Sequence, residues 1–418
     1  MLIPKKWEAM QLTKAKKLSF TEGALFFKIL CFAMPIMATG MLQVLYNMAD
    51  NIIVGRFSGD DNALGAVGST SSLSHLTLNF MLGIAAGTSI LVAQAYGARQ
   101  ENKVSRTVHT ALSFSLILGV AFMILGLIIS RPALMLIGTD ESFIDGAVLY
   151  FRIICFGIPA TAVCNFGAGI LRSVGDSKTP LVILSSAGLI NVGLNLVFVL
   201  CFGMSVAGVA LATVISQYFS AITIVLWLYM KKGQCYSFSF KKLCFDIGIL
   251  KRVLRLGIPA GIQSSIFSLS NIFLMSSVNS LAQLPQYGKH VVTAYTVAGN
   301  IDAITYTACN SFHHAALTFT GQNLGAGKPD RIKKTLIFSL LQVAFVGIMI
   351  GQVELIFGEQ LTTLYIDSTL TAEIKESITA MTMDILYLLL NVYFLCGVMD
   401  VLSGVLKGLG YSIAPQRK

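Results

Sequence analysis

A repeated segment gives the strongest indication of the fold. It reads Gly169-Ile-Leu-Arg172-Ser-Val-Gly175-Asp-Ser-Lys-Thr-Pro180, and it recurs 235 residues later as Gly404-Val-Leu-Lys407-Gly-Leu-Gly410-Tyr-Ser-Ile-Ala-Pro415. Two earlier landmarks recur in the same order and at a similar offset: Pro35 and Asn47 return as Pro259 and Asn271, and Gln94-Ala-Tyr-Gly97-Ala-Arg99 returns as Gln322-Asn-Leu-Gly325-Ala-Gly327. Ordered self-similarity of this kind indicates a duplicated structural unit. We therefore expect two copies of one bundle.

The chain between these landmarks is strongly apolar. Hydrophobic residues make up 55% of its 418 residues and charged residues 12%, against about 25% charged in soluble domains, and its mean hydropathy is +0.74. A membrane-spanning helix needs about 20 largely apolar residues. Ten stretches reach that length, at residues 25–54, 63–94, 107–130, 146–170, 180–203, 206–230, 254–279, 291–321, 335–357 and 378–406. They lack the alternation of a membrane barrel, so we predict an all-α polytopic membrane protein.

The distribution of Lys and Arg predicts the orientation of these spans. Of the 30 basic residues, 25 lie in the terminal segments and the even-numbered connections, 4 lie in the odd-numbered connections, and Arg152 lies within a span. By the positive-inside rule, both termini are then cytoplasmic, in the cell membrane. The net charge of +10 is accounted for by this topology and by contact with anionic lipids, which argues against a nucleic-acid partner.

The predicted domains follow the duplication. A basic cytoplasmic segment covers residues 1–24, an N-lobe of six spans covers 25–230, a basic linker covers 231–253, and a C-lobe of four spans covers 254–418. Six is an even number, so both copies have the same orientation and are related by a pseudo-two-fold axis along the membrane normal.

The second copy is shorter than the first. After Pro180 the first copy continues for 50 residues to Met230, whereas three residues follow Pro415. We expect about two helices to be missing from the second copy, through truncation or a frameshift. The alternative is that ten spans are the native design.

Several motifs resemble the multidrug and toxic compound extrusion (MATE) family, and they fall at matching places in both halves of the chain. They are Leu45-Tyr-Asn47-Met-Ala-Asp50-Asn-Ile-Ile-Val-Gly55-Arg56, Leu64-Gly-Ala-Val-Gly68 and Val206-Ala-Gly-Val-Ala-Leu-Ala-Thr213. The resemblance implies twelve spans, alternating access between two lobes, and export of cationic or lipophilic compounds coupled to entry of H⁺ or Na⁺.

The resemblance also implies ion-coupling residues, and it is closer to the DinF-like branch than to the NorM-like branch. The coupling acid falls on Asp50, and its partners fall on Asn191, Asn195 and Thr213. An acid is usual at position 195, so the site has one carboxylate, which favours a proton slightly over Na⁺. The acids of the NorM-like branch fall on Phe267 and Cys396, so that second site is absent.

Each of these residues also has a structural alternative. Asp50 could be a hydrated acid paired with Arg56. Asn191 and Asn195, at positions i and i+4, share one helix face, where they could equally join helices by hydrogen bonds.

Other polar residues within spans are candidates for the substrate cavity, because charges there usually face the bundle interior or water. The candidates are Asn47, Asn165, Asn271, Asp302 and Asp400, and Asp400 occupies the repeat position of Asn165. We expect Glu354 and Asp384 to be solvated near the outer face, and His313 and His314 to pack between helices or to line a polar wall. The eight cysteines are expected to be packing residues, without a metal or a disulfide.

Three alternatives to a transporter of drugs or metabolites remain to be compared with the sequence: a flippase, an enzyme and an inactive chain. A lipid-linked oligosaccharide flippase should have a cationic central cavity, and the only basic residue placed inside a span is Arg152. No HExxH, GxSxG or clustered acid motif within a span supports an enzyme. The last alternative is an inactive, truncated transporter. We expect a monomer in contact with lipid, without a cofactor apart from the coupling ion.

Overall fold

The structure is a computed structural model that describes residues 20–57, 63–137, 139, 141, 144–242, 245–281, 284, 288, 290–366 and 371–411. These residues form helices joined by short connections, and no strand occurs among them. The expectation of an all-α fold is confirmed. The predicted N-terminal segment and the end of the tail lie largely outside the described residues.

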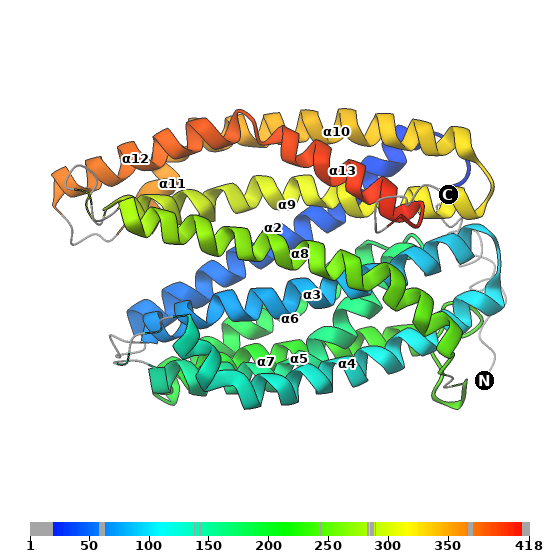
Figure 1. Cartoon of the computed structure of the whole chain (residues 1–418), viewed down its shortest axis with the longest axis horizontal. Coiled ribbons are helices and arrows are strands. Elements are labelled where there is room, and N and C mark those ends of the chain that lie inside the picture. The colour runs from blue at the N-terminus through cyan, green and yellow to red at the C-terminus, as the bar shows by residue number, and fades with distance from the viewer. Residues whose placement is uncertain are drawn as a thin grey trace, which may run out of the picture.

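Two bundles of long helices lie side by side (Figure 1). The N-lobe contains α2 (Leu25–Phe57), α3 (Ala63–Gly97), α4 (Glu101–Leu136), α5 (Ile144–Ser173), α6 (Lys178–Leu196) with the π-helix η1 (Val197–Cys201), and α7 (Val206–Met230). A connection with the short helix η2 (Phe240–Lys242) leads to the C-lobe. It contains α8 (Ile247–Leu281), α9 (His290–Gly325), α10 (Pro329–Ile356), α11 (Gly358–Tyr365), α12 (Ala372–Leu390) and α13 (Phe394–Gly408).

Within the described residues, eight helices are long and apolar enough to cross a membrane, or nine if α12 and α13 form one bent span. The remaining expected span corresponds to α9, which is long enough but more polar. α9 lies inside the C-lobe and has a largely buried inner half. The tenth expected span is not one continuous helix, because α12 and α13 meet at an angle of 44° around residues 391–393.

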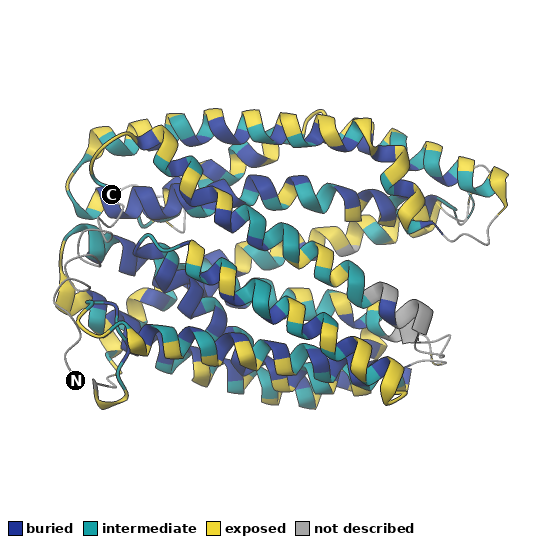
Figure 2. Cartoon of the chain, turned by 180° about the vertical axis from the view of Figure 1, so that it is seen from behind, coloured by how far each residue is buried: buried dark blue, intermediate teal, exposed yellow. Residues whose placement is uncertain are grey.

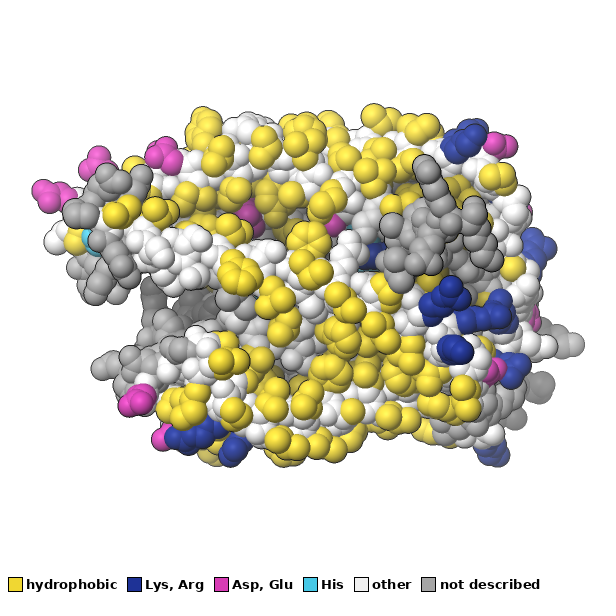
Figure 3. All heavy atoms as spheres, in the orientation of Figure 1, with side chains coloured by type: hydrophobic (Ala, Val, Ile, Leu, Met, Phe, Trp, Pro, Cys, Tyr) yellow, Lys and Arg dark blue, Asp and Glu magenta, His cyan; other side chains and the backbone are white. Residues whose placement is uncertain are grey.

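The surface matches a bilayer environment. Exposed residues run along the outward sides of the helices (Figure 2), and most of the side chains there are apolar (Figure 3). One end of the molecule carries a group of basic side chains (Figure 3). We call it the basic end; here α3 is followed by α4, near Arg99, Lys103 and Arg106, and α9 is followed by α10, near Lys328 and Arg331. The space-filling view is hollowed between the lobes at the opposite end (Figure 3). The lobes therefore meet at the basic end and separate toward the other.

The first helix of each lobe packs against the opposite lobe near the basic end. Leu25, Ile29 and Phe32 of α2 share a core with Phe312 and Phe319 of α9. In the matching arrangement, Val253 of α8 shares a core with Ile84, Ala85 and Phe166 of the N-lobe. The first helix of each lobe thus completes part of the core of the other lobe. We call these two contacts, α2 with α9 and α8 with α3, the seams between the lobes.

Glycines allow the close approach of helices along one seam. Gly83 and Gly87 of α3 face Gly261 and Gly257 of α8, and a Cβ atom on either α3 glycine would collide with the α8 backbone. Small residues permit this spacing in membranes, where van der Waals packing drives much of the helix association.

Two glutamines tie the lobes together at the basic end. Gln94 Nε2 of α3 donates to the Gly408 carbonyl of α13 at 3.0 Å, and Gln322 Nε2 of α9 donates to the Ser173 carbonyl of α5 at 2.7 Å. We call these two hydrogen bonds the glutamine clasp. The two glutamine donors lie at equivalent positions of the two sequence repeats, and so do the two segments that supply the acceptor carbonyls. The duplication therefore accounts for both hydrogen bonds.

The connection between the lobes is held against α4. His109 Nε2 accepts the Ser239 backbone N–H at 3.0 Å, and Arg106 Nη2 pairs with Asp246 Oδ2 at 2.6 Å. Asp246 Oδ1 also accepts the backbone N–H groups of Gly248 and Ile249 at the start of α8. The Ile249 N–H is the main cause that holds the pKa of Asp246 below its usual value, with Arg106 contributing.

This lowered pKa predicts a pH dependence for the docked connection. A carboxyl group with a depressed folded-state pKa stabilises the fold above its unfolded pKa of about 4, and that stabilisation is lost as the pH falls through the folded value. We expect amides of residues 231–242 to be better protected from hydrogen exchange in the wild type than in Asp246→Asn at pH 6. The difference should disappear near pH 3, and a difference that persisted there would contradict the prediction.

Candidate functional site

Four polar residues meet between α2, α6 and α7 of the N-lobe. Asn195 Nδ2 donates to Asp50 Oδ1 at 2.5 Å, and the Asn191 amide lies 3.3 Å from Thr213 Oγ1. Asn191 and Asn195 are 6% and 0% exposed, whereas Asp50 is only partly buried. The residues that the resemblance selected therefore form one cluster, which we call the Asp50 cluster.

The amide of Asn191 also faces the carboxylate. In the orientation that satisfies its neighbours, its Nδ2 donates to Asp50 Oδ1 at 2.9 Å and Oδ2 at 3.2 Å, and its Oδ1 accepts the Thr213 backbone N–H at 3.3 Å. Amide orientations are assigned from such networks. Asp50 is then bound by two amides, and no Lys or Arg side chain within the described residues forms an ion pair with it.

Local sequence explains how the cluster forms. The i, i+4 spacing places Asn191 and Asn195 on one face of α6, and Tyr46, one turn before Asp50, fixes α2 against α6 by donating to the Ser185 carbonyl at 3.2 Å. The π-helix η1 begins two residues after Asn195. Short π-helical segments often mark functional sites, because they break the regular hydrogen-bond ladder.

One neighbour of the cluster was not found from the sequence. Tyr150 of α5 interacts electrostatically with Asp50, but nothing in the local sequence separates this tyrosine from the other twelve. The proposed pairing of Asp50 with Arg56 lies outside the described side chains.

The cluster offers oxygen atoms to a proton or a small cation. The carboxylate of Asp50 contacts Asn195 Nδ2, and the hydroxyl of Thr213 contacts the Asn191 amide. Asn195 Oδ1 is buried and accepts no hydrogen bond among the described residues. Oxygen ligands of this kind suit hard cations, and a single carboxylate within a membrane span can instead exchange a proton. The described residues contain no group of three His, Cys, Asp or Glu side chains that could hold a metal ion.

The C-lobe holds a separate polar group around α9 and α13. Asn310 Nδ2 donates to Asp400 Oδ2 at 3.3 Å, and His313 Nδ1 donates to the Asp400 carbonyl at 2.8 Å. The second bond joins His313 to α13, as expected of a histidine that packs between helices. Acidic and basic side chains are recessed in the body of the molecule beside this lobe (Figure 3).

The expectation that Glu354 is solvated is wrong. Glu354 is 3% exposed, and neither carboxylate oxygen makes a hydrogen bond of normal geometry with the described residues. Its position near the end of α10 suggested water, but the rotation of α10 turns it toward Thr305 of α9 and Asp302. Asp384 is exposed, as expected.

Arg152 is also not the only basic side chain within the helical body. Arg172 and Lys407, in the last turns of α5 and α13, are both partly buried. The sequence placed them in connections because they follow the apolar stretches. Arg152 itself donates to Ser130 Oγ at 3.0 Å.

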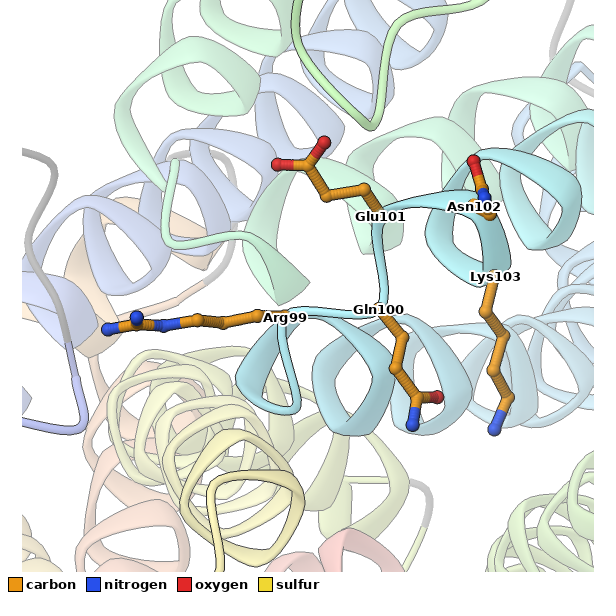
Figure 4. Close-up of a pocket in the computed structure, with 5 residues that line it drawn as sticks. All are labelled: Arg99, Gln100, Glu101, Asn102 and Lys103. Atoms are coloured by element: carbon orange, nitrogen blue, oxygen red, sulfur yellow. The ribbon is translucent and has the colours of Figure 1, made fainter.

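The remaining cavity candidates do not join the Asp50 cluster. Asn47 and Asn271 are exposed and Asn165 is partly buried. A separate surface hollow lies at the turn between α3 and α4, at the basic end (Figure 4), and is lined by Arg99, Gln100, Glu101, Asn102 and Lys103. It is formed by one turn of the chain and contains none of the candidate residues.

The chain is similar to known transporters over most of its length. A family model described as MatE matches residues 35–197 and 259–417. The probable multidrug resistance protein YoeA of Bacillus subtilis (strain 168) is 31% identical over 393 residues, which are 92% of this chain and 81% of the relative.

Solved structures have the same fold. A crystal structure of MATE in complex with MaL6 has a TM-score of 0.86 at 24% identity, covering 95% of this chain and 86% of that chain. The outward-facing conformation of a multidrug resistance MATE family transporter has a TM-score of 0.82 at 24% identity, covering 96% and 87%. The two matched segments contain the landmarks of both repeats, and with the similarity to YoeA they establish that this chain belongs to the MatE family of multidrug efflux transporters.

Proposed function

We propose that this chain is an ion-coupled antiporter that exports cationic or lipophilic compounds by alternating access, with Asp50 as the coupling acid. The observation that carries the proposal is the Asp50 cluster: one carboxylate, solvated by two amides and without a basic partner among the described residues. Such a carboxylate costs several kcal/mol in a membrane unless it is hydrated, paired or protonated. Binding or release of an ion at Asp50 would therefore change which arrangement of the neighbouring helices is most stable.

We further propose that the ion is H⁺, taken up from the outside. With a single carboxylate and neutral neighbours, the cluster has fewer charged ligands than a site built for a metal cation. The basic end faces the cytoplasm of the cell membrane in this proposal, with both termini there, and the hollow between the lobes opens outward. The protein acts as a monomer.

Alternating access requires the closed end to open, and the glutamine clasp is the contact that must break. Each of its hydrogen bonds stabilises the closed state by about 1 kcal/mol. The two seams formed by α2 and α8 can then act as hinges, because each contains a proline, Pro35 or Pro259, within a helix.

Replacing the coupling acid should abolish transport without unfolding the protein. In proteoliposomes with an imposed pH gradient, Asp50→Asn should lower the rate of rhodamine 123 transport by about tenfold or more, because the variant cannot exchange a proton. Asp384→Asn, which removes an exposed acid, is the matched control and should behave like the wild type. Transport by Asp50→Asn at the wild-type rate would overturn the assignment.

A second carboxylate should change the preferred ion. Asn195→Asp places an acid beside Asp50, and two carboxylates with the oxygens of Asn191 and Thr213 make a better cation site. We expect the variant's rhodamine 123 transport to gain a dependence on a Na⁺ gradient at constant pH. Transport that remains insensitive to Na⁺ would argue against an ion site formed by these four residues.

Loss of the glutamine clasp should favour opening of the basic end. Gln94→Ala combined with Gln322→Ala removes about 2 kcal/mol of closing free energy, so amides near Gly97 and Gly325 should exchange hydrogen faster, as measured by mass spectrometry. The control is Gln100→Ala, because Gln100 is exposed and its side chain makes no capping hydrogen bond to α4. Unchanged exchange in the double variant would show that the seams alone close this end.

A further inference from the structure

A short segment before α2 is held by the C-lobe at the basic end. We call residues 20–24 the strap. Arg331, in the first turn of α10, donates from Nη2 to the Phe20 carbonyl at 3.1 Å and from Nη1 to the Gly23 carbonyl at 3.1 Å. A guanidinium presents several N–H donors in a fixed planar arrangement. One side chain of the C-lobe therefore binds two carbonyls of the strap that lie three residues apart.

Two further contacts fix the strap. Lys328 Nζ, at the start of α10, donates to the Thr21 carbonyl at 2.9 Å. The ring of Phe20 is 1% exposed and stacks on Phe319 of α9, with 4.0 Å between the ring centroids. The strap is thus bound to the C-lobe through its backbone and through an aromatic side chain, although it leads into the first helix of the N-lobe.

The inner half of α2, which is nearer the basic end, also packs on the C-lobe. Ile29 lies in the core that α2 shares with α9, and Gln342 Nε2 of α10 donates to the Phe26 carbonyl at 2.7 Å. A Cβ atom on Gly40 would collide with the side chain of Thr307 of α9. From the strap to Gly40, this part of the chain therefore belongs to the C-lobe by its contacts.

The outer half of α2 packs in the N-lobe instead. Tyr46 donates to the Ser185 carbonyl of α6, and Asp50 accepts the Asn195 amide of the same helix. Ile53 lies in a core formed with other N-lobe residues. In Figure 1, α2 accordingly runs diagonally from one bundle to the other. The helix that carries the candidate coupling acid has one half in each lobe.

The strap determines how firmly the inner half of α2 is attached to the C-lobe. Apolar contacts with α9 are non-directional, so they resist sliding or rotation of α2 only weakly. Hydrogen bonds from charged donors depend on distance and angle. The bonds of Arg331 and Lys328 therefore fix the position of α2 along its axis, which the apolar core alone does not.

We propose that Arg331 is a positioning residue for ion coupling: through the strap it makes the inner half of α2 move with the C-lobe when the basic end opens. An ion that binds at Asp50 acts on the outer half of the same helix, in the N-lobe. With its inner end fixed, α2 transmits that effect to the C-lobe. This inference rests on the proposed function, because it takes Asp50 as the coupling acid.

Transport and binding by the purified full-length chain separate positioning from folding. Arg331→Gln should lower the maximal rate of rhodamine 123 transport in proteoliposomes by about tenfold, the usual effect of losing a charge-assisted hydrogen bond. Its affinity for rhodamine 123, measured by fluorescence polarisation in nanodiscs, should stay within about twofold of the wild type. Arg331→Lys retains a charged donor without the planar fork and should recover part of the rate. Lys333→Gln removes an exposed charge from the first turns of α10 and should behave like the wild type.

Hydrogen exchange, measured by mass spectrometry, tests which lobe α2 follows and requires no transport. Gln94→Ala combined with Gln322→Ala weakens closure of the basic end. In this double variant, amides of residues 21–34 should exchange as in the wild type, because they stay with the C-lobe. Adding Arg331→Gln should accelerate their exchange by about tenfold, and adding Lys333→Gln should not.

Three outcomes would overturn the proposal. Faster exchange of residues 21–34 in the double variant, with Arg331 intact, would show that the inner half of α2 moves with the N-lobe. Equal losses of transport rate and rhodamine 123 affinity in Arg331→Gln would assign this residue a purely structural role, and transport at the wild-type rate would remove it from coupling. A wild-type chain that does not transport rhodamine 123 would reject the proposed function itself, whereas the exchange of residues 21–34 decides independently which lobe α2 follows.

Discussion

The contact between the inner ends of α3 and α9 is the constraint on which the arrangement of the lobes depends. Gly97 lies against the Gln322 backbone and Gly325 lies against the Gln94 backbone, so closely that a Cβ atom on either glycine would collide. This packing brings each glutamine side chain within reach of the last carbonyls of a helix in the opposite lobe. Because helix C-termini leave carbonyls without partners, the clasp satisfies groups that would otherwise be exposed at the junction.

The two copies share a backbone plan but differ in their buried charges. The offset that relates Pro35 to Pro259 and Asn47 to Asn271 relates Asp50 to Leu274. The carboxylate of the Asp50 cluster is therefore not duplicated, and the C-lobe acids lie on other helices, at Asp302, Glu354 and Asp400. Unsatisfied polar groups are costly in a membrane. The surroundings of each acid therefore indicate how easily it can change its charge. The N-lobe carboxylate is surrounded by amides that can adapt to either charge state, whereas Glu354 is enclosed without normal hydrogen bonds.

Much of this architecture can be predicted from the sequence, since length and hydropathy locate the helices and the repeated landmarks relate the two halves. The convergence of Asp50, Asn191, Asn195 and Thr213 could be expected only through resemblance, because hydropathy does not say which helices are neighbours. The burial of Glu354 and the partial burial of Arg172 were missed for another reason. Position along a helix predicts depth in the membrane, but burial also depends on helix rotation, which is set by tertiary packing. The bend between α12 and α13 contains no proline, so no residue type in this segment predicts a break in the span.

The glutamine clasp stabilises the closed state at the same junction where two basic side chains are partly buried. The hydrogen bonds of Gln94 and Gln322 hold the lobes together. Arg172 and Lys407 precede the two residues whose carbonyls accept these bonds, and both carry a positive charge. A ligand shifts a conformational equilibrium only by its difference in affinity for the two states. An ion or a substrate can therefore open the basic end only if it binds more tightly when the clasp is broken than when it is formed.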